Sequence, residues 1–200
     1  TGSGKSSLIQ AILNLYPVEK GRIQVGDFSV GDFDLGLYRK QIAFISQDPV
    51  MFLGSIRENL TGDQKTDEQK VLQALERVGL KSWVESLPSG LDFQIEEKGR
   101  NISVGERQLL CMARCLLSDA PVVVMDEATS SVDPQSEEIL VHATEAFFKG
   151  RTQIIIAHRL TTLQHCDRVL WLDRGQVRMF GPREEVLRLF SQAEPKSVST

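Results

Sequence analysis

The stretch VVVMDEATSSVD, residues 122–133, decides how this chain folds. Its four opening apolar residues predict a parallel strand that is covered on both faces, because such a strand has an uninterrupted apolar run. Asp126 and Glu127 then follow at the carboxyl end of the strand, where open α/β sheets place their ligands. Asp126 is suited to hold Mg²⁺ and Glu127 to polarise an attacking water. Taken alone, such a pair is more often a solvated acidic turn.

The first seven residues, TGSGKSS, favour the catalytic interpretation of that pair. They match all but the opening of the phosphate-loop pattern G-x-x-x-x-G-K-[ST]. In this pattern Gly4 lets backbone N–H groups approach phosphate oxygens, Lys5 reaches the β- and γ-phosphates, and the Ser6 hydroxyl can ligate Mg²⁺. We therefore predict a site for ATP and Mg²⁺. The residues predicted to contact the nucleotide here are Thr1, Gly2, Ser3, Gly4, Lys5, Ser6 and Ser7.

Bulk properties exclude some classes of partner. The chain has 200 residues, a net charge of −4 and a pI near 5.5, so electrostatics do not favour a nucleic-acid partner. No apolar run approaches the roughly 20 residues that a membrane-spanning helix needs. The cysteines at 111, 115 and 166 lack the spacing of a metal site or a disulfide framework.

Periodicity predicts an α/β core that a helical segment interrupts. We expect core residues 1–47 and 118–190, a helical subdomain at 48–117, and a polar tail at 191–200. The predicted helices cover residues 7–15, 55–60, 66–78, 81–87, 104–117 and 184–190. The predicted strands cover residues 21–25, 41–45, 122–125, 152–157, 168–172 and 176–178, the last two joined by a hairpin turn at 173–175.

The stretch NISVGERQ, residues 101–108, opens the longest predicted helix. Ser103 can cap that helix, and Gly105 leaves space for a phosphate to approach. An ordinary helix cap would explain Ser103 equally well. Between the two nucleotide motifs, however, the stretch resembles the signature motif L-S-G-G-Q of ATP-binding cassette (ABC) ATPases. Ser103 and Gly105 match that motif, whereas residues 102, 104 and 106 depart from it.

The other motifs of this family occur in the family's order. Gln47 resembles the Q-loop glutamine, which the resemblance places beside Mg²⁺ and the lytic water. Asp126 and Glu127 resemble the Walker B aspartate and the catalytic glutamate, Asp133 lies in a segment that resembles the D-loop, and His158 resembles the switch histidine near the γ-phosphate. The resemblance thus implies catalytic roles for Glu127, His158 and Gln47, and metal contacts for Ser6, Gln47 and Asp126.

The resemblance extends to about residue 190 and implies a RecA-like P-loop NTPase core with an inserted α-helical subdomain. It also implies that the antiparallel β-subdomain at the N-terminus of the family's fold is largely missing. The stretch IEEKG, residues 95–99, is similar to the X-loop of exporters, with Glu96 where glycine is usual. An exporter motor at the cytoplasmic face of a membrane is therefore expected.

The resemblance further implies that two cassettes pack head to tail, so that Ser103 and Gly105 of one cover ATP bound to the other. Residues 48–53 and the X-loop would meet transmembrane domains, in the same chain or in a separate one. The alternatives are a soluble ABC ATPase acting on ribosomes or in DNA repair, an importer cassette, and a regulatory cassette that does not hydrolyse ATP. The last would replace Glu127 or His158, and both are present.

Overall fold

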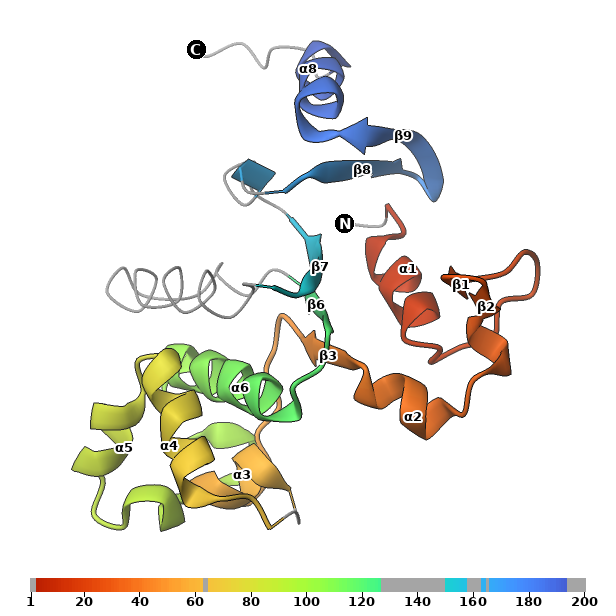
Figure 1. Ribbon diagram of the computed structural model, residues 1–200. Coiled ribbons are helices and arrows are strands. Elements are labelled where there is room, and N and C mark those ends of the chain that lie inside the picture. Colours follow the sequence, from red (N-terminus) through yellow and green to blue (C-terminus); the bar gives the residue numbers. More distant parts are fainter. Residues whose placement is uncertain (1–2, 63–64, 127–149, 158–162, 165, 194–200) are drawn as a thin grey trace, which may run out of the picture. The chain divides into compact units, whose positions relative to one another are not determined.

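The computed structural model describes residues 3–62, 65–126, 150–157, 163–164 and 166–193 (Figure 1). The chain divides into two compact units, one of residues 1–31 and 156–200 and the other of residues 32–155. The subdomain limits predicted from the sequence, 48–117 for the helical part, remain a prediction.

The second unit is built on a three-stranded sheet with the order β3-β6-β7. These strands are β3 (Ile42–Ile45), β6 (Val122–Asp126) and β7 (Thr152–Ile156). β3 and β6 run parallel, with Ile45 opposite Met125. Val123 and Val124 are fully buried, so the apolar run at 122–125 is confirmed as a covered strand. The strand ends at Asp126, one residue beyond its predicted end.

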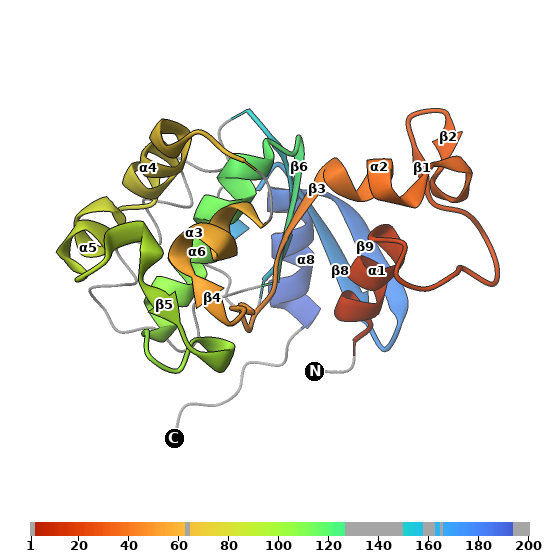
Figure 2. The same ribbon diagram turned by 90° about the horizontal axis from the view of Figure 1, so that it is seen from below.

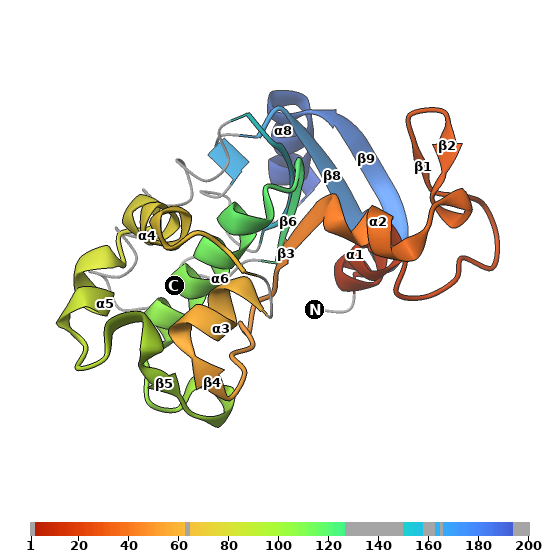
Figure 3. The same cartoon turned by 60° about the horizontal axis from the view of Figure 1, so that its bottom comes forward.

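Helices surround the second unit's main apolar core (Figure 3). The long helix α6 contacts α3, α4 and β3, and the core includes the fully buried Leu75, Ile95 and Leu110. Two short strands, β4 and β5, pair antiparallel beside α3. The helices and short strands are α2 (Leu35–Lys40), α3 (Ile56–Thr61), α4 (Glu68–Arg77), α5 (Lys81–Ser86), α6 (Val104–Ser118), β4 (Gly54–Ser55) and β5 (Gln94–Ile95).

The four helices predicted in this unit are confirmed to within one or two residues at each end. Helix α2 and the strands β4 and β5 were not predicted, because six-residue and two-residue elements are too short for a period to emerge. The Asp34 side chain caps α2 by accepting a hydrogen bond from the Leu37 N–H. In the described ranges, no helix is both long and apolar enough to cross a membrane.

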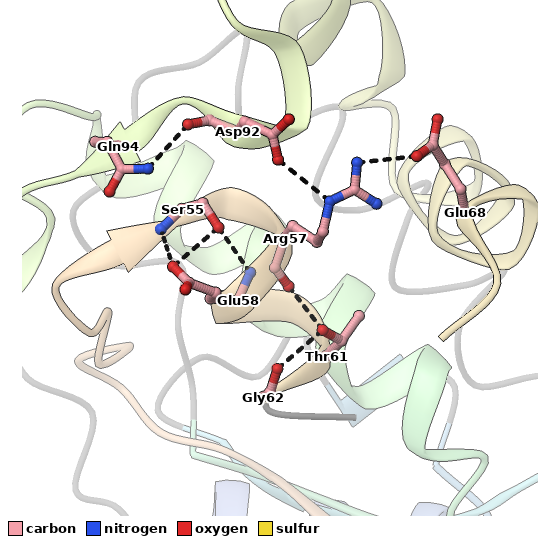
Figure 4. Close-up of polar contacts among 8 residues, drawn as sticks. All are labelled: Ser55, Arg57, Glu58, Thr61, Gly62, Glu68, Asp92 and Gln94. Atoms are coloured by element: carbon pink, nitrogen blue, oxygen red, sulfur yellow. Dashed lines mark hydrogen bonds and ion pairs between the residues drawn. The ribbon is translucent and has the colours of Figure 1, made fainter. Parts of the chain in front are cut away.

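Polar contacts join α3 to its neighbours (Figure 4). Ser55 and Glu58 form a capping box, in which the Glu58 carboxylate accepts from the Ser55 N–H at 2.7 Å. This backbone hydrogen bond lowers the pKa of Glu58. Arg57 contacts Glu68 at 2.9 Å and Asp92 at 3.3 Å, and the hydrogen bond to Glu68 is the main cause of its raised pKa. One side chain of α3 thus joins the start of α4 to the turn before β5.

In its described residues, the first unit contains two antiparallel strand pairs and two helices. Its elements are α1 (Lys5–Ile12), β1 (Gln24–Val25), β2 (Phe28–Ser29), β8 (Arg168–Asp173), β9 (Gln176–Pro182) and α8 (Arg183–Ala193). Helix α8 packs on the β8–β9 hairpin, with Trp171 edge-on to Phe190. The hairpin predicted around residues 173–175 is confirmed.

Three predicted helix ends in the first unit need correction. Helix α1 ends at Ile12 rather than at residue 15, because Asn14 has a left-handed backbone with φ of 51°. It also begins at Lys5, two residues before the predicted start. Helix α8 continues to Ala193, three residues into the segment predicted as a polar tail.

The cysteines of α6 should resist modification in the folded chain. Cys111 and Cys115 are buried, and burial raises the pKa of the Cys115 thiol to about 12. Because the thiolate is the reactive form, we expect a thiol reagent at pH 8 to label Cys166, which is only partly buried, well before the other two. Mass spectrometry of labelled peptides measures this order, and equal labelling of all three sites would contradict it. Urea should abolish the difference.

The same shift predicts how stability depends on pH. Since the folded pKa of Cys115 lies above its unfolded value of 9, its contribution to stability is complete below pH 9. That contribution should be lost as pH rises towards about 12. Unfolding by urea at pH 8 and pH 10.5 tests this, with Cys115→Ala as the variant that should lose part of the pH dependence. An identical decline in both proteins would contradict it.

Candidate functional site

The predicted phosphate loop leads directly into α1. Gly4 is the residue before the helix and has a left-handed backbone with φ of 94°, which glycine adopts without strain. No side chain caps the helix at this end, so its first N–H groups are open to an anion. Lys5 Nζ donates to Ser3 Oγ at 3.1 Å. Ser6 and Ser7 are exposed at the same end. The arrangement fits a group of phosphate oxygens.

The carboxyl edge of the β3-β6-β7 sheet brings together two predicted site residues. Gln47 follows β3 by two residues, and Asp126 ends the neighbouring parallel strand β6. Since Ile45 lies opposite Met125, both side chains belong to the same edge. Gln47 is exposed and Asp126 is half-buried. Amide and carboxylate oxygens are ligands that Mg²⁺ accepts, so the donor set fits this ion.

Ser103 caps α6 through a second capping box. Its Oγ accepts from the Glu106 N–H at 3.2 Å, and the Glu106 carboxylate accepts from the Ser103 N–H at 2.6 Å. Glu106 therefore has a structural reason to stand where the L-S-G-G-Q pattern has glutamine. Because Ser103 Oγ accepts in this box, its O–H remains a donor for another group. Ser103 is exposed, whereas Gly105 is buried.

Hydrogen bonds join the turn before α6 to that helix. Residues 97–99 form a short 3₁₀ turn, with φ of 61° at Lys98 and 69° at Gly99. Arg107 donates to the carbonyl oxygens of Gly99 at 3.1 Å and Ile102 at 2.9 Å. A Cβ on Gly99 would lie 2.7 Å from Arg107 Cδ, so the contact requires glycine there. The predicted X-loop is thus joined to the helix that carries Ser103.

Residues 50–53, here named the apolar loop, expose large side chains just after Gln47. Val50, Phe52 and Leu53 are 58%, 63% and 78% exposed. The buried Asn59 holds this loop from α3, since it accepts from the Phe52 N–H at 2.8 Å and donates to the Phe52 carbonyl at 2.9 Å.

Arg114 fastens the same loop to α6. It donates to the Asn59 carbonyl at 2.7 Å and to the Val50 carbonyl at 3.4 Å, and its guanidinium lies 5.7 Å from the centre of the Phe52 ring. Sequence reasoning missed Asn59 and Arg114, because both bind backbone groups, which every residue carries, and the groups that Arg114 binds lie more than 50 residues away.

Five of the predicted site residues lie outside the described residues, namely Thr1, Gly2, Glu127, Asp133 and His158. Ser3, Gly4, Lys5, Ser6 and Ser7 belong to the first unit, and the sheet edge and Ser103 belong to the second.

These features define a class of protein. The structure has parallel strands with oxygen-bearing side chains at their carboxyl edge, a helix that follows a glycine and is open to anions, and a helical segment with a serine-capped helix. These are features of a P-loop nucleotide-binding domain. Comparison with known proteins gives the family. The family model described as "ABC transporter" matches residues 1–130, and the chain belongs to that family.

The similar proteins include a protein named as a multidrug resistance transporter and one named as a lipid A-core flippase. The chain is 35% identical over 193 residues to the "Probable multidrug resistance ABC transporter ATP-binding/permease protein YheH" of Bacillus subtilis (strain 168), covering 96% of this chain and 29% of that protein. It is 39% identical over 188 residues to the "ATP-dependent lipid A-core flippase" of Burkholderia orbicola (strain AU 1054), covering 94% and 32%. The chain therefore spans about a third of the length of these relatives.

A solved structure agrees with the fold. The "Structure of a bacterial Atm1-family ABC exporter with ATP bound" matches with a TM-score of 0.86 and 28% identity, over 99% of this chain and 36% of that one. The predicted mixed α/β fold of an ABC cassette is thereby confirmed.

Proposed function

We propose that this chain is the ATP-binding and ATP-hydrolysing motor of an ABC membrane exporter. The observation that carries the proposal is the shared carboxyl edge of β3 and β6, at which Gln47 and Asp126 both lie, in a chain of this family. Exporter and flippase relatives that match 94–96% of the chain support the direction of transport.

In this proposal, each candidate site residue has its own role in ATP binding or hydrolysis. Lys5 and the open N–H groups of α1 hold the phosphates and compensate the charge that develops in phosphoryl transfer. Ser6, Gln47 and Asp126 would hold Mg²⁺, which neutralises phosphate charge when it is bound. Glu127 accepts a proton from the attacking water, and His158 and Gln47 orient that water. Asp133, in the segment that resembles the D-loop, would contact the nucleotide.

A second cassette completes the site in this proposal. Ser103 and Gly105 of one cassette cover ATP held by the phosphate loop of the other. The capping box supports a direct role for Ser103, because the box fixes Oγ and leaves its O–H free to donate to a phosphate oxygen. Gly105 is buried, so it would contribute by letting the helix end come close.

Transmembrane domains are the other proposed partner, in the same polypeptide or in another. The apolar loop presents exposed Phe52 and Leu53, which suits an apolar contact with such a partner. Arg114 and Arg107 connect this loop and the 97–99 turn to α6, so motion of α6 would reach both. In this proposal the motor acts at the cytoplasmic face of a membrane.

ATP-dependent pairing tests the proposal. In light scattering, the natural protein that carries this sequence should pair more strongly with ATP and Mg²⁺ than with neither. Ser103→Ala should weaken ATP-driven pairing by roughly 10- to 100-fold, since a hydrogen bond to a charged group is lost. Ser103→Thr is the matched control, because it keeps both the cap and the hydroxyl. Pairing that ignores ATP, or an Ala variant that pairs as wild type does, would refute this role.

A further inference from the structure

Within the first unit, the turn of the β8–β9 hairpin lies against the phosphate loop. The Gly175 N–H donates to the Ser3 carbonyl at 3.0 Å. A Cβ built on Gly4 would lie 3.4 Å from Gly175 Cα, which is close contact. Figures 1 and 2 both show the turn end of the hairpin beside the start of α1. The two segments are about 170 residues apart in sequence and touch through backbone atoms.

The geometry of the turn fixes the direction of that N–H group. Asp173 pairs with Gln176, so Arg174 and Gly175 alone form the turn, with φ of 49° and 75°. Two left-handed residues in a two-residue hairpin match the right-handed twist of the strands. Arg178 contacts the Asp173 carboxylate at 2.8 Å across the hairpin. The turn that carries the Gly175 N–H is therefore held in place by the strand pairing and by this ion pair.

The contact has a consequence for the neighbouring N–H group of the loop. Ser3 C=O and Gly4 N–H belong to one planar trans peptide, so the two groups point in opposite directions. A carbonyl held towards Gly175 turns the Gly4 N–H away from the hairpin. Ser3 is held from its side chain as well, by Lys5 Nζ at 3.1 Å.

We propose that Gly175 is a positioning residue of the phosphate loop, whose N–H holds the Ser3 carbonyl and thereby aims the Gly4 N–H at a nucleotide phosphate. This rests on the proposed function, because the phosphate belongs to ATP. At this position the backbone conformation, and not the available space, limits which residues are tolerated. The φ of 75° disfavours a branched side chain, whereas a Cβ at this position would meet nothing within 4 Å.

Two substitutions of Gly175, made in the natural protein that carries this sequence, separate the effect of backbone conformation from the effect of adding a side chain. Gly175→Val opposes the left-handed backbone and should displace the N–H group. Gly175→Asn keeps that backbone, since asparagine tolerates it, and is the matched control. With a fluorescent ATP analogue and Mg²⁺, we expect Val to raise Kd roughly 10-fold and Asn to change it by less than about 2-fold. In hydrolysis, Val should raise KM while kcat stays near the wild-type value.

A nucleotide-free measurement separates this inference from the proposed function. In ¹H–¹⁵N spectra, the Gly4 amide resonance should move in Gly175→Val and stay in place in Gly175→Asn. Wild-type protein that binds no ATP would refute the proposed function on which the inference rests. Gly175→Val that binds ATP as wild type does, or leaves the Gly4 resonance unmoved, would overturn the inference alone. A fall in thermal stability without a change in Kd would also overturn it.

Discussion

Glu127→Gln should lower the rate of ATP hydrolysis by about 10²–10⁴-fold while leaving ATP affinity within a few-fold of wild type, since a positioned general base contributes that much. Gln keeps the shape of Glu but cannot take a proton from water. In the sequence, Glu127 directly follows Asp126, the last residue of β6. Phosphate release and binding of a fluorescent ATP analogue, measured on the natural protein, give the two quantities.

The paired state provides the control for this experiment. If hydrolysis separates two cassettes, Glu127→Gln should accumulate an ATP-bound pair that wild type forms only transiently. Asp67→Asn, an exposed helix cap on α4, is a matched acid-to-amide change that should leave the hydrolysis rate unchanged. An unchanged hydrolysis rate in Glu127→Gln would show that another residue acts as the general base. A low rate in both the wild type and Glu127→Gln would favour a regulatory cassette.

The sequence predicts best the parts of this chain whose structure is set by neighbouring residues. The uninterrupted apolar run of 122–125 predicts β6, because burial on both faces is the only environment that suits it. Ser103 predicts the start of α6, because a hydroxyl there satisfies an orphan N–H of the first turn. The hairpin at 173–175 follows from Gly175, which supplies a left-handed backbone.

Contacts between distant segments could not be predicted in the same way. Nothing in the residues around Gly175 shows that its N–H meets Ser3, because the partner is a carbonyl that every residue carries. The sequence likewise does not show which acidic residues pair with Arg57, because only the folded chain brings Glu68 and Asp92 to it. Single-sequence patterns predict elements and chemical types of residue, while the tertiary structure decides which polar groups meet.

Asn59→Ala should lower the free energy of unfolding by roughly 3 kcal/mol, and the melting temperature by roughly 6–12 °C, because three backbone groups lose a partner. Asn59 is 4% exposed and bonds both backbone groups of Phe52 and the Ser55 carbonyl at 3.0 Å. Alanine fills none of these roles and leaves buried polar groups without a partner. Thermal and urea unfolding measure the loss.

Asn101→Ala is the matched control, because that side chain also bonds two backbone groups, at 2.9 and 2.8 Å, but is exposed. Water can replace its contacts, so the expected loss is below about 1 kcal/mol. Equal losses in the two variants would show that burial does not set the cost. If Asn59 positions the apolar loop for a membrane partner, Asn59→Ala should also reduce transport per ATP hydrolysed at temperatures where it remains folded, whereas Asn101→Ala should not. A purely structural role would lower stability and leave that ratio unchanged.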